Sequence, residues 1–429
     1  MIFIFIGLLL LNSASGVTIQ FNETDKIIHM DEVSVIPFSI SGLNNMDLSK
    51  ANLVSNSSLW NIVQVSSPEF DAKLLQNKVY NSSVNVTGIF LGKAKVLISF
   101  QYGETQIEST LNVVVIRKAR TIDTIFTASV AILVSLLYVN FGCAMDWDVC
   151  KKTIKKPIGP LIGCVCQFLL MPMISYVLGL LLFPSHPEMQ LGLFFTGISP
   201  SGGASNIWTI ILGGNLNLSV TMTTLCTIAA FGLMPMWLFT LGKIIFDKAN
   251  LIMPYDKIAT FAIGLIIPLT IGYLIQKKLP RFSVIMVRIM KPFSVCLIIF
   301  IVIFAIITNL YLFRLFSWQI ILAGLGLPWL GFIFGLLVAF IFRQQNQDIR
   351  AIAIETGVQN TGVAIFLLRF SLKQPDADLT TVIPVSCAIM TPLPLMVLYC
   401  VKLVIDKRKK KLMRSQEKVQ DPLQDTSTA

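Results

Sequence analysis

Nine long apolar segments follow Arg120, and they constrain the fold of this chain more than any other feature. They lie at about residues 122–143, 157–183, 189–212, 216–246, 258–276, 285–310, 318–342, 349–368 and 380–405. A helix needs about 20 apolar residues to cross the hydrocarbon core of a bilayer, and each segment is close to that length or longer. The segments therefore predict an all-α polytopic membrane domain over residues 120–405, with nine transmembrane helices and the lipid bilayer as their surroundings.

The composition excludes an ordinary soluble enzyme. Charged residues make up 13% of the chain, whereas soluble domains carry about 25%. Two histidines leave little material for histidine-based metal or acid–base chemistry, so no enzymatic activity is expected. The net charge of +11 fits lysine and arginine kept on the cytosolic side of a membrane rather than a surface for nucleic acid.

The distribution of basic residues predicts the orientation of the chain. Nine crossings that start outside place the carboxyl terminus inside, with a cytosolic tail at residues 406–429. The segments assigned to the inside hold eighteen lysines and arginines, and the short outer loops hold six. This bias indicates an extracellular amino terminus and a cytosolic carboxyl terminus. We expect a multi-pass protein of the plasma membrane.

The first 119 residues have a different pattern. Residues 1–16 are a short apolar run ending in small residues, which predicts a signal peptide; a short membrane anchor is the alternative. Residues 17–119 alternate between apolar and polar in short segments, which predicts a small extracellular β-sandwich. Asn-x-Ser/Thr sequons, expected to be glycosylated, begin at Asn22, Asn56, Asn81 and Asn85.

Two of the nine segments contain polar, helix-breaking residues at mid-depth. The third has Ser-Pro-Ser-Gly-Gly-Ala-Ser-Asn at 199–206, and the eighth has Glu-Thr-Gly-Val-Gln-Asn-Thr-Gly at 355–362. Proline removes a backbone donor and glycine lowers the helical preference. Unwound backbone is tolerated in a bilayer only where protein or a cavity satisfies it. The pattern predicts two discontinuous helices that cross at the midplane, with two merely kinked helices as the alternative.

The spacing of the breaks favours discontinuous helices. They lie five crossings apart, so their helices run in opposite directions, as inverted-topology repeats require. The second repeat would be crossings five to nine, and the first would be crossings one to four, without one leading helix.

Glu355 is the acidic residue placed deepest within a crossing. A charged carboxylate at the bilayer centre costs about 2.5–3.5 kcal/mol on insertion scales, which argues for a functional role. A protonated or paired structural glutamate is the alternative. Gln359 follows four residues later and shares a helical face with Glu355 where the backbone stays helical. Carboxylate and amide oxygens suit a hard cation such as Na⁺.

Further oxygen-bearing side chains gather near the breaks. Ser205 and Asn206 follow the first break, and Ser219 and Thr223 lie four residues apart on the next helix. Gln167 interrupts the second crossing. Singly, such residues often form hydrogen bonds between helices. As a set around two breaks they predict a cation site.

These motifs resemble the bile acid:sodium symporter family over residues 122–405. The stretches that carry the resemblance are 167–172, 199–206, 217–224 and 355–360. The resemblance implies Na⁺-coupled uptake of an amphipathic organic anion, of the bile acid or sulfated steroid class, by alternating access.

The resemblance also implies two bound Na⁺ ions and assigns residues to them. The first site matches Ser205, Asn206, Thr223 and Glu355, with Ser219 nearby. The second matches Gln167, Glu355 and Gln359, with backbone carbonyls around Thr356 and Val358. Asn360 matches a residue that approaches the substrate.

Two other functions would suit a membrane protein of this kind. A receptor or regulatory protein would use the extracellular domain and transport little or nothing, but an idle core should have lost the ion ligands that are present here. A cation/proton antiporter usually needs adjacent mid-membrane aspartates, and the sequence places none there.

Overall fold

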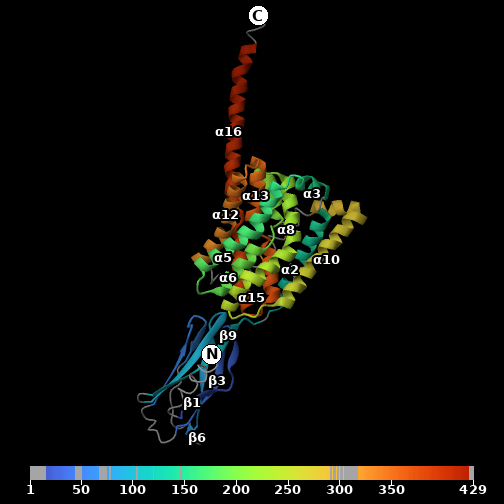
Figure 1. Ribbon diagram of the computed structural model, residues 1–429. Coiled ribbons are helices and arrows are strands. Elements are labelled where there is room, and N and C mark those ends of the chain that lie inside the picture. The colour runs from blue at the N-terminus through green and yellow to red at the C-terminus, as the bar shows by residue number, and fades with distance from the viewer. Residues whose placement is uncertain are drawn as a thin grey trace. The chain divides into compact units, whose positions relative to one another are not determined.

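The computed structural model of the chain describes residues 16–43, 51–66, 75–76, 79–102, 105–118, 120–144, 147–289, 292, 296, 299, 303 and 317–424. The chain divides into two compact units, one of Met1–Arg120 with Lys373–Leu379 and one of Thr121–Leu372 with Thr380–Ala429. The first is rich in β-strands and the second is helical (Figure 1). The expected signal peptide, apart from its last residue, lies outside the described residues.

The β-rich unit contains two sheets. The described strands are β1 (Thr18–Phe21), β2 (Asp25–His29), β3 (Val33–Ser41), β4 (Asn52–Ser57), β5 (Val63–Val65), β6 (Leu75–Gln76), β7 (Val79–Gly88), β8 (Gly92–Tyr102) and β9 (Thr105–Ile116). One sheet has the order β1-β3-β7-β5, with β6 also on β7, and the other has the order β2-β9-β8-β4. The expected β-rich region before the helices is therefore confirmed.

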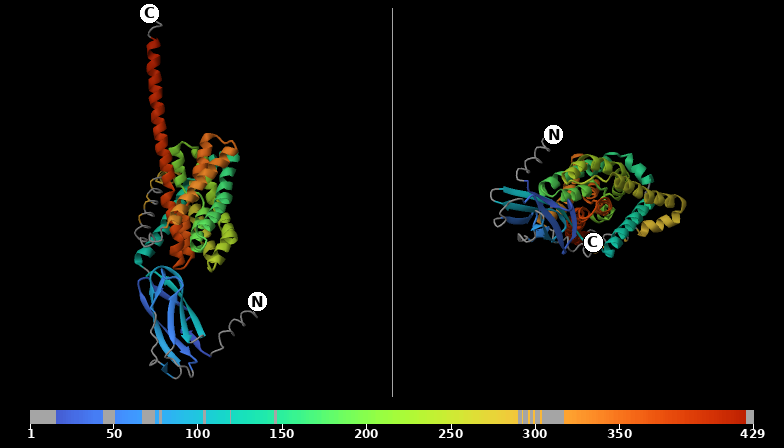
Figure 2. Two further views of the ribbon diagram at one scale, coloured as in Figure 1. Left: turned by 90° about the vertical axis from the view of Figure 1, so that its left-hand side faces the viewer. Right: turned by 90° about the horizontal axis from the view of Figure 1, so that it is seen from below.

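One apolar core lies between the two sheets, which face each other in Figure 2. Alternate residues of each long strand point inward, as the pleat of a strand requires. Phe38 and Tyr80 from one sheet and Ile98 and Leu111 from the other are fully buried there. This is the sandwich arrangement, in which two inner faces form a single core.

The helical unit follows the apolar segments closely. Its first half contains α2 (Thr121–Ala144), α3 (Trp147–Ile154), α4 (Ile158–Val165), a π-helical turn (Cys166–Leu170), α5 (Met171–Leu182), α6 (Pro187–Ile198), α7 (Ala204–Leu212), α8 (Leu216–Trp237), a π-helical turn (Leu238–Gly242) and α9 (Lys243–Lys248). Its second half contains α10 (Tyr255–Lys278), α12 (Trp318–Ile341), α13 (Asn346–Gly357), α14 (Thr361–Ser371), α15 (Asp376–Met390) and α16 (Pro392–Gln424).

Several of these helices are long and apolar enough to cross a membrane. Among the described residues they are Ile158–Leu182, Leu216–Lys248, Trp318–Ile341 and Asp376–Arg408. A mostly helical domain with membrane-length helices is thereby confirmed. Most of the expected sixth crossing, 285–310, lies outside the described residues, so nine crossings and the repeat arrangement stay predictions.

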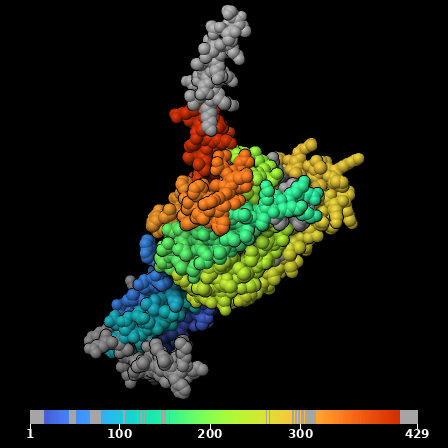
Figure 3. Space-filling model, turned by 45° about the horizontal axis from the view of Figure 1, so that its top comes forward, coloured from blue at the N-terminus to red at the C-terminus, as the bar shows by residue number. Residues whose placement is uncertain are grey.

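Glycines allow close helix packing in this unit. A Cβ added to Gly142 of α2 would lie 2.3 Å from the Leu269 carbonyl oxygen of α10. A Cβ added to Gly272 of α10 would lie 2.1 Å from the Val139 oxygen of α2. Such contacts bring two backbones together without side chains between them. Segments distant in sequence also pack together, as Figure 3 shows for orange α12 beside green α5.

Candidate cation site

The two interrupted segments meet each other. The third crossing is broken between α6 and α7, and the eighth is broken between α13 and α14. The Gly202 amide donates to the Val358 carbonyl at 2.8 Å, and the Asn360 amide donates to the Pro200 carbonyl at 2.9 Å. Ser201 and Gln359 form an isolated antiparallel bridge between them. Each break therefore satisfies backbone groups that the other leaves free, as an apolar environment demands.

Glu355 lies in the last turn of α13, at this crossing, and only 1% of the residue is exposed. The Ser219 hydroxyl lies 2.9 Å from its Oε2 atom, and the Thr223 hydroxyl donates to its Oε1 atom. In the part of the chain that the structure describes, no basic side chain forms an ion pair with Glu355. Hydroxyl groups, rather than a counter-charge from the protein, surround the carboxylate.

Ser219 and Thr223 each face more than one acceptor oxygen in this cluster. Asn206 Oδ1 lies 2.8 Å from Ser219 Oγ and 3.4 Å from Thr223 Oγ1, and these hydroxyls also face the two Glu355 oxygens. Each hydroxyl carries a single proton, so the two cannot satisfy all three acceptors at once. The Ser205 hydroxyl lies near Glu355 but is buried without hydrogen-bond geometry to any described group. A cation at this point would complete the coordination of these oxygens.

Five predicted residues are thus brought together by three helices. Residues from α7, α8 and α13 converge on one point; they are Ser205, Asn206, Ser219, Thr223 and Glu355. Sequence reasoning missed Thr209, whose hydroxyl donates to Ser219 Oγ at 3.2 Å and is fully buried. Its place one turn beyond Ser205 on the short helix α7 was the available signal.

Gln167 and Gln359 form a second cluster at the crossing. Gln167 lies in the π-helical turn Cys166–Leu170, a feature often found at functional sites. Its Nε2 atom donates to the Ser199 carbonyl and to Gln359 Oε1, each at 2.7 Å. Gln359 Nε2 donates in return to Gln167 Oε1 at 3.3 Å and to the Thr356 carbonyl at 2.7 Å. The predicted pair is therefore joined directly.

The predicted backbone ligands already have hydrogen-bond partners. The Thr356 carbonyl accepts from Gln359, and the Val358 carbonyl accepts from the Gly202 amide and from Ser201 Oγ at 3.3 Å. Ser201 Oγ also lies 2.9 Å from the Glu355 carbonyl. A carbonyl oxygen has two lone pairs. A cation at Val358 would thus have to displace a partner, whereas Thr356 has a lone pair left beside Gln359.

Asn360 has a local structural role as well as its place at the break. Its Oδ1 atom accepts from the Val363 amide at 3.2 Å and so caps the start of α14. The residue is 8% exposed. Its backbone joins the crossing through Pro200, whereas its side chain bonds to the helix that follows rather than to either cluster of oxygens.

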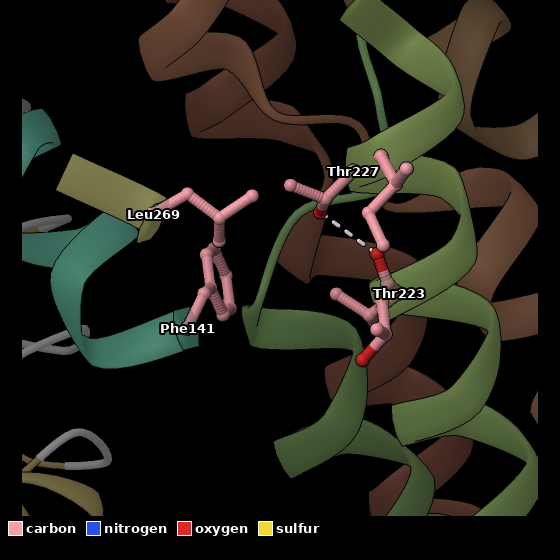
Figure 4. Close-up of a pocket in the computed structure, with 6 residues that line it drawn as sticks. Phe141, Thr223, Thr227 and Leu269 are labelled. Carbon is pink, nitrogen blue, oxygen red and sulfur yellow. Dashed lines mark hydrogen bonds between the residues drawn. The ribbon is translucent and has the colours of Figure 1, made fainter. Parts of the chain in front are cut away.

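A small hollow borders the first cluster, and sequence reasoning missed it. It is lined by Phe141, Thr223, Thr224, Thr227, Ile228 and Leu269. In Figure 4, Phe141 and Leu269 face Thr223 and Thr227. The Thr227 hydroxyl donates to the Thr223 carbonyl at 2.7 Å. One wall is therefore apolar, from α2 and α10, and the other carries hydroxyls of α8. Threonines at positions 223 and 227 share a face of α8, which was the available signal.

The four predicted glycosylation residues lie in the β-rich unit. Asn22, Asn56, Asn81 and Asn85 are all exposed. Asn81 and Asn85 lie four positions apart on β7, so both face away from the sandwich core. Their exposure leaves room for a glycan at each position.

A helical membrane domain in which two broken helices meet around a buried carboxylate has the organisation of secondary transporters. The model of the Sodium Bile acid symporter family matches residues 131–314. The ileal sodium/bile acid cotransporter of Cricetulus griseus is 30% identical over 272 residues, which are 62% of this chain and 76% of that protein. The chain belongs to the sodium bile acid symporter family, a family of transporters rather than enzymes.

Two other relatives extend the comparison. The P3 protein of Homo sapiens is 31% identical over 261 residues, which are 60% of this chain and 54% of that protein. The sodium-dependent organic anion transporter of Bos taurus is 32% identical over 257 residues, 58% of this chain and 66% of that protein. The chain thus spans about half the length of the human P3 protein. The family match includes α7 and α8 but ends before Glu355.

Proposed function

We propose that this protein is a sodium-coupled symporter that takes up an amphipathic organic anion, of the bile acid or sulfated steroid class, by alternating access. The family and the multi-pass helical domain support a transporter. The names of two relatives, an ileal sodium/bile acid cotransporter and a sodium-dependent organic anion transporter, support the sodium coupling and an anionic substrate.

One observation carries the proposal: the oxygen cluster around Glu355. Acceptor oxygens of Asn206 and Glu355 compete for the hydroxyl protons of Ser219 and Thr223, and among the described residues the buried carboxylate forms no ion pair. The desolvation of a carboxylate is offset best by a cation that it coordinates directly. We assign the first Na⁺ to Ser205, Asn206, Ser219, Thr223 and Glu355.

The second Na⁺ is assigned to Gln167, Gln359 and Glu355, with the carbonyls of Thr356 and Val358. Each glutamine Oε1 atom accepts one hydrogen bond from the other amide and keeps a second lone pair for the ion. Two Na⁺ entering with one monovalent anion move one net charge. Each elementary charge is worth about 2.3 kcal/mol per 100 mV of membrane potential.

The coupling between ions and substrate follows from charge. Without sodium, Glu355 repels an approaching anion, and two Na⁺ make the site net positive, so anion binding improves. We place the polar end of the substrate near Asn360.

The remaining architecture completes the proposal. We propose a signal peptide at 1–16, a glycosylated extracellular domain at 17–119, a transporter domain at 120–405 with nine crossings in inverted repeats, and a cytosolic tail at 406–429. The plasma membrane is the proposed location. A receptor without transport is less favoured, because it would leave the oxygen cluster without a role.

Uptake measurements test the proposal. Cells or vesicles containing the protein should accumulate at least one labelled anion from a panel of bile acids and sulfated steroids in Na⁺ medium, and none in choline medium. Glu355→Gln should abolish the sodium-dependent part at equal surface expression. Uptake of the same anion at the same rate in choline would reject sodium coupling.

A further inference from the structure

The carboxyl end of α7 is held by basic side chains from two other helices. α7 is a short helix, Ala204–Leu212, and its first turn supplies Ser205 and Asn206 to the proposed sodium site. Its last carbonyls need partners, because the end of a helix leaves them without intrahelical donors. Gly213, at φ 74°, turns the chain so that its amide reaches Ile210 at 3.2 Å and the Gly214 amide reaches Thr209 at 2.7 Å.

Lysine and arginine satisfy the carbonyls that remain. Lys402 Nζ of α16 donates to the Ile211 carbonyl at 2.7 Å. Arg350 Nη1 of α13 lies 3.4 Å from the Leu212 oxygen and 3.2 Å from the Gly213 oxygen. Positive charge at this end of a helix is also favoured by the helix dipole. Lys402 is half-buried and makes the shorter contact, whereas Arg350 is exposed, so Lys402 is the stronger of the two anchors.

The turn after α7 is fixed to the same helix that carries Glu355. The Asn215 amide donates to the Gln347 carbonyl at 2.9 Å, and Asn215 Nδ2 donates to Asp348 Oδ1 at 2.7 Å. Gln347 and Asp348 belong to the first turn of α13, whose last turn holds Glu355. α7 is therefore tied to α13 at both ends, at the crossing through Gly202 and at the far end through Asn215.

Lys402 brings a third helix into this frame. α16 runs without interruption from Pro392 to Gln424, and its carboxyl-terminal part extends beyond the other helices (Figure 1). The ammonium group of Lys402 makes the polar contact of this helix with the end of α7, and Leu395 of α16 shares an apolar cluster with Leu212. A small axial shift of α7 moves Ser205 and Asn206 relative to Glu355, and ligand geometry tolerates little displacement.

We propose that Lys402, assisted by Arg350, is a positioning residue of the sodium site: it fixes α7 so that Ser205 and Asn206 face Glu355, and it couples sodium affinity to α16. The proposal rests on the proposed function, because it assumes that these residues bind Na⁺. Lys402 itself touches neither ion.

Sodium-dependent thermal stabilisation of the purified full-length protein tests this without knowledge of the substrate. An ion that binds only the folded state raises Tm with concentration. Unfolding is followed in NaCl–KCl mixtures of constant ionic strength, which gives the Na⁺ concentration at half-maximal stabilisation. We expect Lys402→Met to raise that concentration about tenfold, as loss of an outer support of an ion site does. Lys402→Arg should restore it, and Lys407→Met, an exposed lysine on the same helix, should leave it unchanged.

The outcomes are distinct. Wild-type protein with equal Tm in NaCl and KCl would overturn the sodium site, and the inference with it. If wild type and Lys402→Met reach half-maximal stabilisation at the same Na⁺ concentration, the inference is overturned but the sodium site is not. The inference also fails if Lys402→Met lowers Tm equally in both salts, since that is a purely structural effect. Should Lys402→Met not yield folded protein, Lys402→Ala removes the same donor, and an unchanged sodium midpoint there overturns the inference.

Discussion

The side-chain amides of Gln167 and Gln359 donate to one another across a sequence separation of 192 residues. Each amide also binds a backbone carbonyl of a broken helix, Ser199 for Gln167 and Thr356 for Gln359. Because the pair bridges both breaks, it ties the second proposed sodium position to the geometry of the crossing.

Removal of one amide should affect one sodium ion. We expect Gln167→Ala to lower the Hill coefficient for Na⁺ in uptake assays from about two to about one, because a single site then remains. The maximal uptake rate at high sodium concentration should fall by a smaller fraction than the Hill coefficient does. An unchanged Hill coefficient would place the second ion elsewhere.

Neutralisation of the buried carboxylate should be more severe. Glu355→Gln keeps the size of the side chain but removes its charge, and charge-assisted contacts are worth about 1.5–3 kcal/mol each. We expect the apparent sodium affinity to fall at least about tenfold, measured by sodium-dependent Tm shifts. Glu188→Gln is the matched control, because Glu188 is bonded to His186 at 3.1 Å, away from the site. An equal loss of apparent sodium affinity in Glu355→Gln and Glu188→Gln would contradict the assignment of Glu355 to the sodium site.

Gly203 leaves room for the ring of Phe141. A Cβ at position 203 would come within 2.8 Å of Phe141 Cζ, whereas a Cβ at Gly232 would meet nothing within 4 Å. Overpacking costs about 1–3 kcal/mol. Gly203→Ala should therefore lower Tm and Gly232→Ala should not. The double variant Gly203→Ala/Phe141→Leu should recover part of the loss, and a loss of Tm that is equal in the single and double variants would refute this contact.

The sequons give a test of the orientation. Asn22→Gln, Asn56→Gln, Asn81→Gln and Asn85→Gln should each increase the electrophoretic mobility of protein made in mammalian cells. Asn217 also begins a sequon, but it lies in α8 on the proposed cytosolic side and should carry no glycan. Glycosylation at Asn217 would reverse the proposed topology.

Local chemistry explains what the sequence predicted well. Pro200 with its glycines, and Gly357 with its polar neighbours, cannot sustain helix in an apolar run, so both breaks were predicted near their observed places. Glu355, Ser219 and Thr223 were expected to lie together because polar side chains inside a bilayer are costly unless they interact, and their hydroxyl and carboxylate groups are hydrogen-bonded in the structure.

Contacts between distant segments were not predictable in the same way. Lys402 and Ile211, or Phe141 and Gly203, have no pattern that links them before the helices are placed. The direction in which the Gln167 and Gln359 amides point also depends on neighbours from both breaks. The spacing of apolar residues and the residue types predict helices and strands, but which residues contact one another depends on how those helices and strands pack.

The backbone contact at Gly142 and Gly272 has a mechanical consequence. With no side chain between them, α2 and α10 have little freedom to slide or separate, so in the proposed transport cycle they would move together as one rigid pair. Phe141 and Leu269, one from each helix, would keep their mutual spacing throughout the cycle. The width of the hollow would then change only through motion of α8, which forms the opposite wall.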